Sequence, residues 1–134
     1  MSTSAPIHAA GLRAVALVSA VYDLALALPM LFWAEGLARL FGAAVPVPLV
    51  NAQLNGVFTL TLAAGYFWAA QDPEARRGYL WVAGVLAKSL GALLFVLDHF
   101  THGSPRTFLL FAVSDGSLAL WTLWALWRRG PSTR

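Results

Sequence analysis

A run of twenty residues, Tyr79–Asp98, is almost entirely apolar and carries one lysine, Lys88, at its centre. As an α-helix, such a run rises about 30 Å, which is the thickness of the hydrocarbon core of a bilayer. Ten of its residues are Leu, Val or Phe, and their insertion free energies, about −3 to −6 kcal/mol together, offset the roughly +2.5 to +3.5 kcal/mol of one central lysine. The run therefore predicts a membrane span with an ammonium group at mid-depth, for which a buried partner is expected.

Three other segments have the length and apolar character of membrane spans. With the first run, the predicted spans cover about residues 12–33, 48–70, 79–98 and 107–127. Only 11% of the chain is charged, whereas soluble domains have about 25% charged residues. We therefore expect residues 1–134 to form a single integral membrane domain, an all-α four-helix transmembrane bundle.

The segment between the first two spans, residues 34–47, predicts a short amphipathic helix that lies in the membrane interface. Glu35 and Arg39 are four residues apart, which suits a helical ion pair. The apolar residues expected on one side of this helix are Leu37, Leu40, Phe41 and Ala44. Two prolines, Pro46 and Pro48, are expected to end it. A plain loop is the alternative.

Arginines predict how the spans are oriented, because cytoplasmic loops are rich in Lys and Arg. Six arginines fall on one side of the predicted spans, namely Arg13, Arg76, Arg77, Arg128, Arg129 and Arg134. Two fall on the other side, Arg39 and Arg106. We expect a multi-pass protein of the cell inner (plasma) membrane with both termini and the loop 71–78 in the cytoplasm.

The composition also excludes several classes of function. The chain has no cysteine, so disulfides, thiolate metal sites and thiol catalysis are excluded. The net charge is +3, but no basic face or Lys/Arg run is present, so nucleic acid is not an expected partner. No cofactor is expected from any motif. The expected partners are the lipid bilayer and either a second copy of the chain or a larger membrane complex.

Three ionisable residues fall at the same predicted depth in three different spans. Counted at 1.5 Å per residue, Asp23, Lys88 and Asp115 each lie about 15–18 Å from the cytoplasmic edge. In a four-helix bundle with its polar faces inward, the three side chains would meet. Asp23 is expected to be the closer partner of Lys88.

The second span supplies further polar side chains. Asn51, Asn55 and Thr59 recur at every fourth residue and so form a stripe on one helix face, which Tyr66 continues. Asn55, together with Tyr66 or Ser114, is an expected hydrogen-bond partner of the charged residues. Asn51 is a further candidate.

Two interpretations of the charged layer stay open. Two carboxylates and one ammonium carry a net charge of −1, and burying it is costly, so the site is expected to take up a proton or to hold a polar ligand group. Alternatively, the ion pair only fixes the register of the bundle. The segments 21–28 and 113–120, which contain Asp23 and Asp115, are identical at five of eight positions. Either chance or an inverted repeat explains this match.

Asp98, His99 and His102 form a second candidate site. Two histidines three residues apart, beside a carboxylate, can bind Zn or Cu at the end of a helix. The alternative is a polar helix end at the outer interface, capped before Gly103 and Pro105.

The chain resembles the DoxX-like group of small bacterial membrane proteins. The resemblance lies in its size, its four hydrophobic segments, its polar layer and a spaced pattern of Gly84, Lys88 and Gly91. It implies a prokaryotic inner membrane, and no catalytic residue is carried over from it. Three functional classes follow in order: a protein that binds or moves a proton or a small, largely apolar ligand; a structural or accessory subunit of a membrane complex; and a membrane-embedded enzyme acting on a lipid-like substrate.

Overall fold

The computed structural model describes the backbone of residues 4–128 and the side chains of residues 9–128. Over this range it is all-helical and contains no strand. The elements are α1 (Ser4–Phe32), α2 (Ala34–Leu40), α3 (Val50–Gln71), α4 (Arg77–Tyr79), η1 (Leu80–Ala87), α5 (Lys88–His102), η2 (Arg106–Phe108) and α6 (Leu109–Trp127). Because α4, η1 and α5 follow one another without a break, Arg77–His102 forms one continuous helix.

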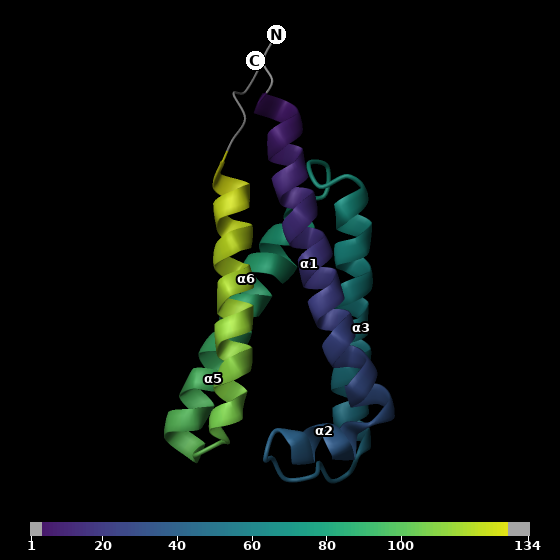
Figure 1. The fold of residues 1–134 in the computed structure, drawn as a ribbon, viewed down its shortest axis with the longest axis vertical. Coiled ribbons are helices and arrows are strands. Elements are labelled where there is room, and N and C mark those ends of the chain that lie inside the picture. The colour runs from purple at the N-terminus through teal and green to yellow at the C-terminus, as the bar shows by residue number, and fades with distance from the viewer. Residues whose placement is uncertain (1–3, 129–134) are drawn as a thin grey trace.

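The long helices form two antiparallel pairs (Figure 1). α1 packs along α3, and α5 packs along α6. The two pairs come together at the end that holds the start of α1, η1 and the end of α6, and they diverge toward the other end, where the short helix α2 lies (Figure 1). This arrangement places the interior of the molecule between two hairpins that are joined more tightly at one end.

The packing is inverted relative to that of a soluble protein, with small residues inside and large apolar residues outside. The fully or nearly buried alanines of the long helices include Ala16, Ala20, Ala27, Ala63, Ala69 and Ala83. In contrast, Leu90, Leu94 and Val113 are 57%, 65% and 68% exposed. Small residues let helix backbones approach closely where lipid, not water, surrounds the bundle, so this pattern indicates a membrane environment.

Three of the described helices are long and apolar enough to cross a membrane, by length and composition. They are Ala9–Phe32, Arg77–His102 and Arg106–Trp127, which correspond to the predicted first, third and fourth spans, although the first ends one residue before the predicted limit at residue 33. The predicted second span is present as α3, a helix of 22 residues, but its polar residues keep it outside this group. Three of the four predicted spans are therefore confirmed as long apolar helices, whereas the four-span bundle stays a prediction.

The predicted short helix exists as α2, and its ion pair is confirmed by a distance of 3.3 Å between Arg39 Nη2 and Glu35 Oε2. Its predicted end at the prolines is wrong. The helix ends at Leu40 because Gly42 adopts a left-handed φ of 68°. The amide of Ala43 then donates to Ala38 O and that of Gly42 to Arg39 O, which is the bond pattern of a Schellman cap.

The predicted apolar side of α2 is correct in part. Leu37, Phe41 and Ala44 line one cavity, whereas Leu40 is 67% exposed and points away. In place of Leu40, the buried residues of the helix are Ala34 and Ala38.

The segments that carry the two predicted groups of arginines lie at opposite ends of the molecule. The loop 72–76, the start of α1 and the end of α6 lie at one end of the molecule, whereas α2 and the α5–α6 connection lie at the other (Figure 1). Arg129 and Arg134 belong to the orientation argument but lie outside the described residues.

Glycines of the lysine-bearing helix permit close contact with α6. A Cβ added at Gly84 would lie 2.7 Å from Thr122 Cγ2, and one added at Gly91 would lie 3.7 Å from Asp115 Oδ2. Thr122 is itself fixed, because its hydroxyl donates to Leu118 O at 2.7 Å. The η1 segment that contains Gly84 is a π-helix, a rare form that is frequently found at functional sites.

We predict that Gly84→Ala destabilises the protein, because the new methyl overlaps Thr122 and overpacking costs about 1–3 kcal/mol. Gly116→Ala is the matched control, since its Cβ would meet Ala92 at an ordinary 3.8 Å. Thermal unfolding in detergent should show a lower midpoint for Gly84→Ala and an unchanged or higher one for Gly116→Ala. Equal midpoints would show that α6 does not need the close approach.

Candidate functional site

The centre of the site is the ammonium group of Lys88, which binds two carboxylates from two other helices. Lys88 Nζ lies 2.8 Å from Asp23 Oδ1 and 3.1 Å from Asp115 Oδ1. The three residues belong to α5, α1 and α6. The predicted meeting of these side chains is therefore confirmed, with Asp23 as the closer partner.

Local structure explains how the three groups reach one another. Lys88 is the first residue after the π-helical segment η1, whose wider turns set the direction from which α5 begins. Gly91, one turn further along, leaves room for Asp115. On α1, Ala20 and Ala27 are fully buried on either side of Asp23, so the acid lies on the face that packs into the bundle.

Burial makes the charge balance of this cluster important. The side chains of Lys88, Asp23 and Asp115 are 7%, 4% and 17% exposed. One ammonium faces two carboxylates, so the fully ionised cluster carries one excess negative charge. Within the described part of the chain, Asp23 Oδ2 is buried and has no hydrogen-bond partner. An unpaired buried carboxylate oxygen is costly, so the cluster lacks one hydrogen-bond donor.

Two tyrosine rings surround the ammonium. Lys88 Nζ lies 4.8 Å from the ring centroid of Tyr22 and 5.7 Å from that of Tyr66, within the range of cation–π attraction. The Tyr22 hydroxyl shares a hydrogen bond of 2.7 Å with Ser114 Oγ. The Tyr66 and Ser19 hydroxyls are close enough to interact, but among the described residues neither makes a hydrogen bond of normal geometry.

The sequence did not predict a role for Tyr22, and it predicted that Ser114 would bind the charged residues, whereas Ser114 bonds Tyr22. Consecutive helix residues are about 100° apart, so a residue beside Asp23 in the sequence is not expected on the same face. Tyr22 reaches the lysine because its side chain is long, and Ser114 acts through Tyr22 instead of binding the charges. A signal was present in the order of the residues: Tyr22 precedes Asp23 as Ser114 precedes Asp115.

A cavity of about 200 Å³ borders the charged cluster. Its polar lining consists of Tyr22, Asp23, Thr59, Tyr66, Lys88 and Asp115. Thr59 comes from α3, so all four long helices contribute to this space. The structure therefore places the predicted residue Tyr66 at the cluster, together with Thr59 of the predicted polar stripe.

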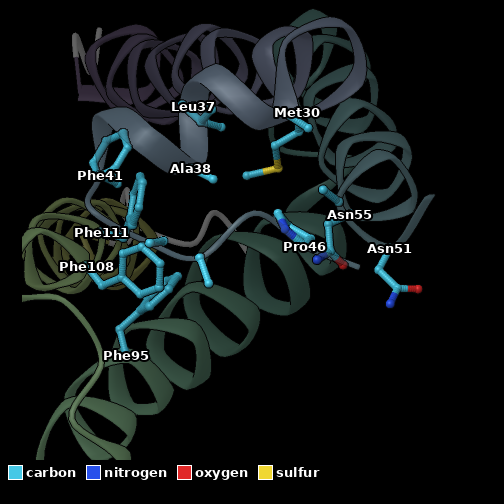
Figure 2. A pocket seen from close by; sticks show the side chains of 14 residues that line it. Met30, Leu37, Ala38, Phe41, Pro46, Asn51, Asn55, Phe95, Phe108 and Phe111 are labelled. Carbon is cyan, nitrogen blue, oxygen red and sulfur yellow. The ribbon is translucent and has the colours of Figure 1, made fainter. Parts of the chain in front are cut away.

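A second cavity, of about 310 Å³, lies beneath α2. Figure 2 shows Phe41, Phe95, Phe108 and Phe111 gathered on one side of it, with Met30 opposite and its sulfur pointing inward. The rings of Phe41 and Phe111 stack at 4.8 Å between centroids. Three residues, Met30, Phe95 and Phe111, line both cavities, so the apolar space adjoins the polar one.

The two asparagines of the polar stripe lie at the larger cavity. Asn51 and Asn55 are exposed and line its rim, where Asn55 lies beside Pro46 and Asn51 points away (Figure 2). The prediction that Asn55 binds the charged residues is therefore not supported by the geometry. The polar stripe of α3 therefore extends beyond the charged cluster. Asn51 and Asn55 lie at the cavity beneath α2, and Thr59 lies at the cavity that borders the charged residues.

The histidine motif divides into two separate contacts. His102 Nδ1 lies 2.9 Å from Asp98 Oδ1, and His99 Nδ1 lies 2.7 Å from Ser104 O. Among the described side chains, no group of three or more His, Asp or Glu residues could hold a metal ion. The helix does end here as expected, with Gly103 in a left-handed conformation at φ 70°.

No family model, curated protein or solved structure matches the chain. The resemblance to the DoxX-like group therefore stays a prediction, and the site must be interpreted from its own chemistry.

We predict that Lys88→Met strands two buried carboxylates and lowers the free energy of unfolding by about 3–5 kcal/mol. Asp115→Asn should cost less than Asp23→Asn, because Asp115 is the more exposed acid. Arg39→Met is the control, since it breaks an ion pair whose side chains are 72% and 55% exposed and should cost less than about 1 kcal/mol. Unfolding in mixed detergent micelles measures all four, and similar losses for Lys88→Met and Arg39→Met would contradict the structural role of the cluster.

Proposed function

We propose that this chain is a membrane protein that binds a small, largely apolar ligand, whose polar group reaches the Asp23–Lys88–Asp115 cluster at mid-membrane depth. The observation that carries the proposal is that Asp23 Oδ2 is buried without a hydrogen-bond partner among the described residues, in a cluster that borders a cavity. A polar group that completes the hydrogen bonding lowers the cost of burying the charges. A proton fills the same role when the site holds no ligand.

The spanning arrangement extends to α3 in this proposal. α3 packs along α1, and Thr59 and Tyr66 of its polar face line the smaller cavity. Its opposite surface exposes large apolar side chains, including Phe58 at 60% and Trp68 at 51%. Polar residues that face a cavity are tolerated within a membrane, whereas large apolar residues suit lipid contact. We therefore assign α3 as the fourth span of a plasma-membrane bundle.

Packing at the two ends of the bundle favours binding over passage through the membrane. At the end where the hairpins meet, Leu12, Leu80 and Leu126 are 0%, 0% and 2% exposed and belong to one continuous core. At the other end, the hairpins diverge and the larger cavity lies between them. A ligand is expected to reach the cluster from the α2 end, which the arginine distribution assigns to the outside.

A purely structural role is the second candidate, favoured by the close packing of Lys88 and Asp23. It requires no water-filled space beside the charges, because an ion pair that only fixes register is best sealed. The two roles therefore differ in whether a small reagent reaches the cavity.

We predict that Thr59→Cys reacts with the small cationic reagent 2-aminoethyl methanethiosulfonate in native membranes, because residue 59 lines the polar cavity. Thr61→Cys is the control: each threonine hydroxyl bonds the carbonyl four residues earlier, but residue 61 is exposed on the outer surface of the helix. A lipid-facing thiol does not ionise, so it should stay unmodified. The chain has no native cysteine, so mass spectrometry reports each site directly.

Equal lack of reaction at both positions would show that the cavity is sealed. That result would favour the structural role and overturn the proposed binding function.

A further inference from the structure

We propose that the ligand is a lipophilic organic cation, with a protonated amine as its polar group and a small aromatic or otherwise apolar body. This proposal rests on the binding function above and names the chemistry of the ligand. It follows from three features of the described residues: the sign of the excess charge, the hydrogen-bonding character of the lining and the shape of the adjoining apolar cavity.

The sign of the charge selects against anions. Lys88 contacts Oδ1 of both acids, so its positive charge is already shared between two carboxylates. The fully ionised cluster has one negative charge in excess, and an anionic ligand would add to it in a medium of low dielectric constant. A cation brings the total to zero, and it does so without removing the ammonium of Lys88.

The lining offers an unpaired carboxylate oxygen, further acceptors and aromatic faces, beside the buried hydroxyl of Tyr66. Asp23 Oδ2 lacks a partner within the described chain, and Asp115 retains 17% exposure beside the cavity. The hydroxyl of Thr59 already donates to Asn55 O, which leaves its oxygen as an acceptor. The rings of Tyr22 and Tyr66 attract one cation, Lys88, and line the same cavity. A protonated amine donates to these acceptors, stacks against the aromatic faces and supplies the positive charge that balances the second carboxylate.

The larger cavity suits the body of the ligand. Its volume of about 310 Å³ is at the lower end of the range for small-molecule sites, so it fits a body of one or two rings. Phe95 and Phe111, with centroids 5.3 Å apart, extend from this cavity to the polar one. Met30 faces them, and its thioether adapts to aromatic surfaces of different shape. A ligand with its amine at Asp115 and its rings against Phe111 occupies both spaces.

The test uses three probes of the same shape: naphthalene-1-methanamine, naphthalene-1-methanol and naphthalene-1-carboxylate. Each is titrated by isothermal calorimetry against the purified full chain in a nonionic detergent, with a protein-free detergent blank. We expect the amine to bind at least about tenfold more tightly than the alcohol, the effect of one charge-assisted hydrogen bond. The carboxylate should bind more weakly than the alcohol or not at all.

Variants assign the effect to the site. Asp115→Asn removes the excess charge but keeps the Lys88–Asp23 pair, so the amine and the alcohol should bind it equally. Glu35→Gln removes an exposed carboxylate on α2 and should keep the preference for the amine. Phe111→Leu should weaken the amine and the alcohol in parallel, because both place their rings on Phe111. Thermal unfolding checks that each variant is folded.

The possible failures are distinguishable. Equal binding of amine and alcohol to the unmodified protein, with both weakened by Phe111→Leu, overturns the cationic ligand but keeps the binding function. Absence of binding by all three probes overturns the ligand class. Only if Thr59→Cys is also unreactive does the binding function fail with it. An amine preference that survives Asp115→Asn also overturns the proposal, because the charge responsible then lies elsewhere.

Discussion

The interaction on which the rest of this structure depends is the contact of one ammonium group with two carboxylates inside an apolar bundle. A lone lysine at the centre of the helix Arg77–His102 is costly in lipid, and the acids of α1 and α6 offset part of that cost by direct contact. Asp23 belongs to the hairpin of α1 and α3, whereas Lys88 and Asp115 belong to the hairpin of α5 and α6. The contact therefore also fixes how the two hairpins meet. Small residues such as Gly84 and Gly91 allow α6 to approach closely enough for this contact to form.

The two aspartates occupy corresponding positions in two similar segments of the sequence. Asp23 and Asp115 occupy the same position in the two weakly similar segments 21–28 and 113–120, and α1 and α6 run in opposite directions (Figure 1). The residues before them, Tyr22 and Ser114, bond each other at 2.7 Å. The ammonium group of Lys88 therefore lies between two antiparallel helices, each of which presents an aspartate to it. An inverted repeat would place the two acids in this way.

Sequence alone predicts the helices and the meeting of the three charges, because both follow from regular quantities: apolar length, and depth counted at a fixed rise per residue. It fails where the chain departs from regularity. The end of α2 depends on the conformation of Gly42, not on the nearest proline. The role of Tyr22 depends on side-chain length, and the position of Asn55 depends on how far the hairpins diverge. The apolar cavity could not be predicted either, because it arises from a void between elements and not from a pattern within one.

The hydroxyl of Thr107 donates to Phe41 O, and the ring of Phe41 stacks on Phe111. These two contacts fasten the residue that follows α2 to η2 and to the start of α6, at the turn of the second hairpin. The short helix α2 thus connects the two hairpins at the end where they diverge, beside the larger cavity. We expect an occupant of the larger cavity to displace α2, because Ala34, Leu37 and Ala38 of this helix line the cavity and these two contacts hold its end in place.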